Sequence, residues 1–225
     1  LHPRVRRQRQ MCIRDSIYSV GLPSIIMQSI TSVMTYGMNL ILISFSATAV
    51  TVLGIYFKLQ SFIFMPIFGL NNGMIPIIAY NYGSRSKKRI MDTAKLSIAI
   101  AIGIMLLGLV IFQVFTPQLL MLFNASDSLL EIGIPALRTI SLSFLFAGYC
   151  IITGSVFQAL GNGVYSLIIS VARQLLCILP LAYIFSHVWG LHAVWFAFPM
   201  AEIISTLLTS ILFKRIYNKK IKVLE

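Results

Sequence analysis

Four charged side chains stand inside long apolar stretches of this 225-residue chain. They are Lys58, Arg138, Arg173 and Glu202. A charge within an apolar helix is costly, so it marks an ion path, a pairing partner or a side chain that reaches the polar boundary. Lys58 and Arg138 lie near the ends of their stretches and are expected to reach outward. Arg173 and Glu202 are expected to pair and anchor two helices, with ion coupling as the alternative.

A polar stripe follows the first apolar stretch. Its members are Gln28, Thr31, Ser32, Thr35 and Asn39. Offsets of three, four, seven and eleven residues place them on one face of a helix. An unpaired amide is costly in hydrocarbon, so this face should look at protein or water. Hydrogen bonding between helices, worth about 0.6–2 kcal/mol for each bond, is one use for such a face.

The second apolar stretch combines helix-bending, small and polar residues. They are Pro66, Gly69, Asn71, Asn72, Gly73 and Pro76. The prolines each remove a backbone hydrogen bond and predict a bend. The glycines would let a neighbouring helix approach closely. The amides could reach the freed carbonyls or a ligand, and a hinge and a static kink both stay open.

The apolar stretches contain no arrangement of residues typical of a catalytic site. The apolar stretches hold no paired carboxylates, no Ser/His pair and no cluster of metal ligands. The cysteines Cys12, Cys150 and Cys177 lack metal-binding spacing, and no disulfide framework is implied. We therefore expect neither an enzyme nor a resident cofactor or metal.

Composition explains why these residues are set in apolar surroundings. The chain is 58% hydrophobic and 11% charged, against about 25% charged residues in a soluble domain. It predicts an integral membrane protein. The net charge of +12 falls mainly in segments 1–16, 84–95 and 214–225, each with a net charge of +4. Basic segments separated by apolar spans are typical of the positive-inside rule, and nucleic-acid binding is not expected.

The elements that must position these residues are six predicted spanning helices, which makes the fold class all-α. A span needs about 20 apolar residues. The predicted ranges are about 17–46, 51–82, 90–115, 129–156, 164–186 and 191–213, followed by a basic tail at 214–225. Six spans bring the three basic segments to one side of the membrane. The 84–90 loop and the C-terminus are expected to be cytoplasmic, in a multi-pass protein of the cell membrane.

Residues 1–16 form a separate leader. It is basic and has no apolar region of the kind found in a signal peptide. Within it, "MCIRDS" resembles the conceptual translation of a sequencing-library adapter. We expect an assembly artefact and leave the leader out of the fold. A genuine basic cytoplasmic tail is the alternative.

Four ordered motifs resemble one transporter family. The stretch "GIYFKLQSFIFMPIFGLNNGMIPIIAYNYGSR" from Gly54 carries a P-x-x-G-x-x-x-G-x-x-P spacing followed by N-Y-G. It is similar to the second helix in the C-terminal half of MATE (multidrug and toxic compound extrusion) transporters. "GLPSIIMQS" at Gly21 resembles the start of the seventh MATE helix, and "VFQALGNG" at Val156 the turn between the tenth and eleventh. "ARQLLCILPLAYIF" and "GLHAVWFAFPMAEI" resemble the last two helices.

The resemblance implies that this chain is one half of a two-lobe transporter. A MATE protein has twelve helices in two six-helix lobes, with the substrate cavity between them. This chain resembles the C-terminal lobe, so the N-terminal lobe is an expected partner, together with the lipid bilayer. The resemblance makes the polar stripe, with Asn71 and Asn72, a cavity wall. It makes the Pro66–Pro76 segment a gating kink.

The implied function is secondary active efflux of cationic amphipathic compounds in antiport with H⁺ or Na⁺. The first predicted span has no acid after Asp15, and the fourth has only Glu131 near its end. The coupling-ion site is therefore expected in the missing N-terminal lobe. Two alternatives stay open. One is a lipid-linked oligosaccharide flippase of the wider superfamily, and the other is a membrane fragment that is inactive without its second lobe.

Overall fold

The computed structural model describes residues 3–224, and these form a bundle of long helices. The described part of the chain contains no strand. Its elements are α1 (Pro3–Ile43), α2 (Ala47–Gly83), α3 (Lys87–Val114), α4 (Thr116–Met121), α5 (Asp127–Ser141), α6 (Phe144–Ala159), α7 (Gly163–Val171), the π-helical η1 (Ala172–Ile178), α8 (Leu179–Trp189), α9 (Leu191–Val194), α10 (Ala197–Ile216), the π-helical η2 (Tyr217–Ile221) and the 3-10 turn η3 (Lys222–Leu224). The all-α prediction is confirmed.

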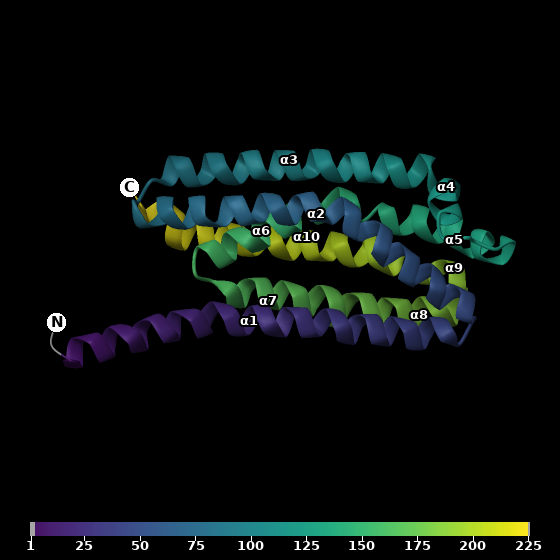
Figure 1. Ribbon diagram of the computed structural model, residues 1–225, viewed down its shortest axis with the longest axis horizontal. Helices are drawn as coiled ribbons and strands as arrows, with labels where there is room; N and C mark the ends of the chain where they lie inside the picture. Colours follow the sequence, from purple (N-terminus) through teal and green to yellow (C-terminus); the bar gives the residue numbers. More distant parts are fainter. Residues whose placement is uncertain (1–2, 225) are drawn as a thin grey trace.

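Five helical segments are long and apolar enough to cross a membrane, and α5 with α6 makes a sixth if the pair is counted as one span. In lipid, each backbone group must find its partner inside the segment, so long apolar runs become helices. Figure 1 shows α3 along one edge and α1 along the other, with α2, α6 and α10 between them. Helices α7 and α8 pack on α1, while α3 packs on α2 and α6.

The fourth predicted span, 129–156, differs from the structure because it is broken. Helices α5 and α6 meet at 49° across Leu142 and Ser143. At the break, the amides of these two residues donate to carbonyls three residues back instead of four. The carbonyl of Arg138 instead accepts a bond from Gln113 Nε2 of α3, at 2.9 Å. A side chain from a neighbouring helix thus satisfies the backbone where the span bends.

Both ends of the described chain are helical. Helix α1 begins at Pro3, so the described part of the leader continues the first helix, whereas residues 1 and 2 lie outside the described residues. Arginine and glutamine are good helix formers, which accounts for this extension. The expected tail at 214–225 is helical to Leu224 and packs on the lobe. Ile221 is fully buried, and Lys220 Nζ donates to the carbonyl of Leu160 at 2.9 Å.

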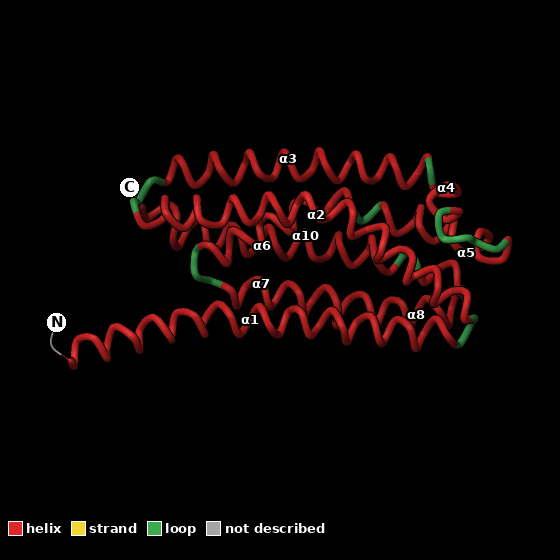
Figure 2. The backbone as a smooth tube through the Cα atoms, in the orientation of Figure 1, coloured by secondary structure: helices red, strands yellow, loops and turns green. Residues whose placement is uncertain are grey.

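An aromatic cluster forms the core at the ends of α2, α3 and α6. Tyr56 meets Phe112 edge-on at 6.4 Å between ring centroids, and Phe112 meets Phe144 at 5.3 Å. Both termini and the α2–α3 turn lie at the opposite end of the bundle, as Figures 1 and 2 show. The three basic segments therefore share one end of the lobe.

Candidate functional site

The polar stripe of α1 lies on the outside of the lobe. Gln28, Thr31 and Ser32 are exposed, while Thr35 and Asn39 are half-buried. The adjoining face of α1 holds Ile30, Met34, Met38 and Leu42, which are buried against the rest of the chain. The stripe therefore runs along the edge of the buried face, and it makes no helix-to-helix hydrogen bond in the described part of the chain.

Two kinds of polar group make up this stripe. Thr31 Oγ1 donates to the carbonyl of Met27 at 3.2 Å, and Thr35 Oγ1 to that of Thr31 at 2.9 Å. These hydroxyls are satisfied by their own helix. The amides of Gln28 and Asn39 form no side-chain hydrogen bond with any described residue. They are left able to bind water, a ligand or another protein surface.

The two asparagines of α2 do not share a surface, which corrects the expectation that both line a cavity. Asn72 is exposed, but Asn71 is only 5% exposed, and its Oδ1 finds no hydrogen-bond partner among the described residues. Neighbouring residues on a helix point about 100° apart, so two adjacent amides can face different surroundings, one the interior and the other the outside. Asn71 belongs to the interior of the lobe.

The bending residues of α2 also lie on its outer face. Pro66, Gly69, Gly73 and Pro76 are all exposed. Helix α2 continues through both prolines and changes direction along its length (Figure 1). A Cβ added at either glycine would meet nothing within 4 Å, so no described helix packs closely there. The close approach expected at these glycines is therefore not made by the described residues of this chain.

Close approach occurs instead at Gly148 of α6. A Cβ at this position would lie 3.2 Å from the backbone of Ala101 in α3. Gly108 of α3 is similarly crowded by the side chain of Ile63, at 2.6 Å. These glycines let α3 pack against α6 and α2.

The structure brings Arg173 and Glu202 together. Arg173 Nη1 lies 3.3 Å from Glu202 Oε1 and 3.5 Å from Oε2, joining η1 to α10. The Glu202 side chain is 7% exposed and that of Arg173 is 26% exposed. Arg173 stands in a π-helical turn, an irregularity that often occurs at functional sites.

A row of hydroxyls and a thiol extends from this pair, and the sequence analysis did not identify it. Thr206 Oγ1 donates to the carbonyl of Glu202 at 2.8 Å and lies 3.3 Å from Cys150 Sγ of α6. Ser205 and Thr209 also approach this sulfur, each at 3.9 Å. Offsets of three, four and seven from Glu202 place all three hydroxyls on its face of α10, so helical spacing was the available signal.

The remaining intramembrane charges are placed differently. Lys58 Nζ lies 5.9 Å above the ring of Phe123, and Arg138 Nε donates to Thr116 Oγ1 at 3.4 Å. Both side chains are exposed, and their partners Phe123 and Thr116 lie in or next to α4. Among the described residues, no group of three or more His, Cys, Asp or Glu could hold a metal ion.

Comparison with known proteins gives concordant results. The MatE family model matches residues 23–184. The multidrug export protein MepA of Staphylococcus haemolyticus is 26% identical over 205 residues, covering 91% of this chain and 45% of that protein. An outward-facing multidrug resistance MATE family transporter superposes with a TM-score of 0.84 at 26% identity, covering 92% of this chain and 46% of that one.

A further solved structure, a MATE protein in complex with MaL6, gives a TM-score of 0.85 at 27% identity and covers 94% of this chain. The match covers 48% of the length of that solved structure. The chain thus spans less than half the length of the proteins that it resembles.

Proposed function

Because the chain belongs to the MatE family of membrane transporters, we propose that it forms the C-terminal lobe of a multidrug exporter. In this proposal a second, N-terminal lobe faces the outer surface of α1 and α2. The substrate cavity lies between the two lobes and opens to alternate sides of the membrane. The fraction of MepA that the chain covers, 45%, supports this arrangement.

The contrast between two outer faces carries the proposal. Helix α3 exposes aliphatic residues, among them Leu96, Leu107 and Val110. Helix α1 also exposes aliphatic residues, among them Ile25 and Val33, but it adds the polar stripe with Gln28 and Thr31. Lipid accepts the first face, whereas amides without partners need water or protein. We therefore assign the α3 side to lipid and the α1 side to the cavity.

The chemistry of the stripe favours amphipathic substrates. It presents amides and hydroxyls without any charge, so it can donate to and accept from varied ligands. A cavity for a pyrophosphate-linked oligosaccharide would need cations, and this stripe has none. Cationic amphipathic compounds fit better, since amide and hydroxyl oxygens can face their charge.

Coupling to H⁺ or Na⁺ is assigned to the N-terminal lobe. Glu202, the buried carboxylate of this lobe, is already compensated by Arg173 at 3.3 Å. A paired carboxylate is poorly placed to take up a cation, because the guanidinium occupies its oxygens. We propose that the pair anchors α10 to the fifth span.

Orientation follows from the basic segments. They gather at one end of the bundle, which we assign to the cytoplasm by the positive-inside rule. This places the 84–90 loop and the C-terminus on the cytoplasmic side of the cell membrane.

Dye efflux by the complete two-lobe transporter tests the proposal. Asn39→Ala and Gln28→Ala should alter the spectrum of exported cationic dyes. Asn218→Ala, an exposed asparagine in η2 at the basic end, is the matched control and should leave efflux unchanged. Asn71→Ala should act through stability and not through substrate spectrum. An unchanged spectrum in both stripe variants would refute the cavity assignment.

A further inference from the structure

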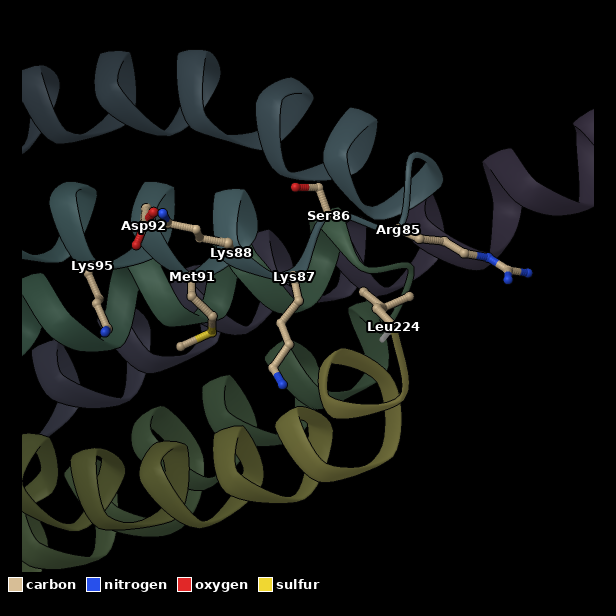
Figure 3. A pocket seen from close by; sticks show the side chains of 8 residues that line it. All are labelled: Arg85, Ser86, Lys87, Lys88, Met91, Asp92, Lys95 and Leu224. Atoms are coloured by element: carbon tan, nitrogen blue, oxygen red, sulfur yellow. The ribbon is translucent and has the colours of Figure 1, made fainter.

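The last described residues of the chain lie across the basic end of the lobe. Residues 217–224, called here the C-terminal segment, form η2 and η3 and continue α10. At the end of this segment, Leu224 lines the same hollow as Arg85 and Ser86 of the α2–α3 turn and Met91 of α3 (Figure 3). The C-terminal segment therefore extends from the end of α10 to the start of α3.

The π-helical form of η2 turns two separated isoleucines toward the lobe. Ile216, at the end of α10, is 3% exposed, and Ile221 is fully buried. In an α-helix, a residue five positions further along points about 140° away, because each residue adds about 100°. A π-helix closes its hydrogen bonds over five residues, so positions five apart come close to alignment. The wider turn thus lets both side chains pack on the lobe and holds the C-terminal segment against it.

Lys220 joins the C-terminal segment to two other helices at once. Its Nζ donates to the carbonyl of Leu160 at the C-terminus of α6, at 2.9 Å. The same Nζ lies 5.8 Å from the centroid of the Tyr82 ring, in the last turn of α2. A cation is favourable both at a helix C-terminus and over an aromatic ring. One side chain therefore contacts the ends of α2 and α6.

The α6–α7 turn receives its positive charge from this lysine. The turn, "ALGNG" at 159–163, contains no Lys or Arg, although the other segments at this end of the lobe are basic. Gly161 has a φ of +73°, which lets the chain reverse tightly. The carbonyl of Leu160 accepts from Asn162 Nδ2 at 3.2 Å within the turn and from Lys220 Nζ across the chain. The lysine thus adds a contact between elements to a bond that is otherwise local.

We propose that the C-terminal segment is a strap, with Lys220 as its positioning residue, that makes the basic ends of α2, α6 and α10 move as one body. The buried isoleucines hold the strap to the lobe, and Lys220 extends this hold to α2 and α6. The break between α9 and α10 lies at the opposite end of the bundle, near α4 and α5 (Figure 1). That end can change shape while the strapped end stays together.

Hydrogen–deuterium exchange of the full chain in detergent micelles tests the strap. Lys220→Met keeps an apolar side chain but removes the ammonium. The amides of Gly161 and Asn162 should exchange about tenfold faster, because a charged hydrogen bond is lost. The amides of Ser84 and Arg85, which close the last turn of α2, should exchange about threefold faster, because the cation–π contact is lost. Lys220→Arg should keep most of the protection at both places.

Three matched variants separate the strap from local effects. Lys219→Met removes the same charge from an exposed neighbour and should leave both places unchanged. Asn162→Ala should loosen the α6–α7 turn alone, because its bond to Leu160 lies within that turn. Tyr82→Leu should loosen the end of α2 alone.

The pattern across the variants decides the proposal. Faster exchange at both places in Lys220→Met, with none in Lys219→Met, is the expected result. A response of the α6–α7 turn alone, or an equal response in Lys219→Met, would overturn the strap. Faster exchange that extends to the amide of Phe115, at the other end of α3, would mean general loosening of the lobe and would overturn it as well.

Discussion

The interior of the lobe and its outer α1–α2 face contain the same kinds of residue in opposite circumstances. Inside, Gly148 is crowded by the backbone of Ala101, and Arg173 is paired with Glu202. Outside, Gly73 meets no neighbour, and Asn39 has no hydrogen-bond partner in the described chain. Small and polar residues in a membrane helix therefore have two uses: they hold one lobe together, or they prepare a surface for something beyond it.

Removing one member of the buried ion pair should produce the largest difference between the regions. Arg173→Met leaves Glu202 buried and unpaired, and should lower the free energy of unfolding by about 3–5 kcal/mol. Unfolding by sodium dodecyl sulfate in mixed micelles measures this loss. The double variant with Glu202→Met should recover much of it, because no isolated charge remains. A loss below about 1 kcal/mol in the single variant would contradict a structural role.

Replacing a glycine by alanine should give the second-largest difference in unfolding free energy between the two regions. Gly148→Ala forces a Cβ against the Ala101 backbone and should cost about 1–3 kcal/mol of unfolding free energy. Gly73→Ala meets open space and should be neutral or stabilising by up to about 1 kcal/mol. The same unfolding titration compares them. Equal costs would mean that the outer face of α2 is packed within the lobe.

A smaller effect is expected for a hydrogen bond between helices. Ser166 Oγ of α7 donates to the carbonyl of Gly154 in α6 at 2.7 Å. Ser166→Ala should cost about 0.6 kcal/mol of unfolding free energy, the average for such bonds in membrane proteins. Ser61→Ala is the control, because its hydroxyl bonds only to the carbonyl of Phe57 in its own helix. If the control costs as much, helix-to-helix bonding is not the cause.

The smallest effect belongs to the outer stripe. Thr31→Val with Thr35→Val removes hydroxyls that bond only to their own helix. The free energy of unfolding should stay within about 0.5 kcal/mol of the parent. Differential scanning fluorimetry in detergent resolves a change of this size. A larger loss would show that this face is part of the folded core.

Much of the fold could be predicted from the sequence because lipid imposes a simple constraint on it. Long apolar runs had to be helices, and an even number of spans predicted that the basic segments gather at one end of the bundle. The break near Leu142 was not predictable in the same way. The carbonyl that it frees, that of Arg138, is bonded by Gln113, which is close in space but distant along the chain.

The site was predicted less completely, since the rotation of each helix is set by packing. Periodicity placed the α1 stripe on one face, and the structure places that face outside. Nothing in the pair Asn71–Asn72 indicates which amide turns inward. The π-helical turn that carries Arg173 likewise depends on how η1 meets α10, so spacing along the chain does not predict it.

The locally satisfied hydroxyls of α1 have a consequence for biogenesis. Thr31 and Thr35 need no second lobe to complete their hydrogen bonds. During insertion, these two hydroxyls therefore add no unmet hydrogen-bonding group to the polar face of α1. A helix built in this way carries few unmet polar groups into the bilayer, and Gln28 and Asn39 hold the amides among them.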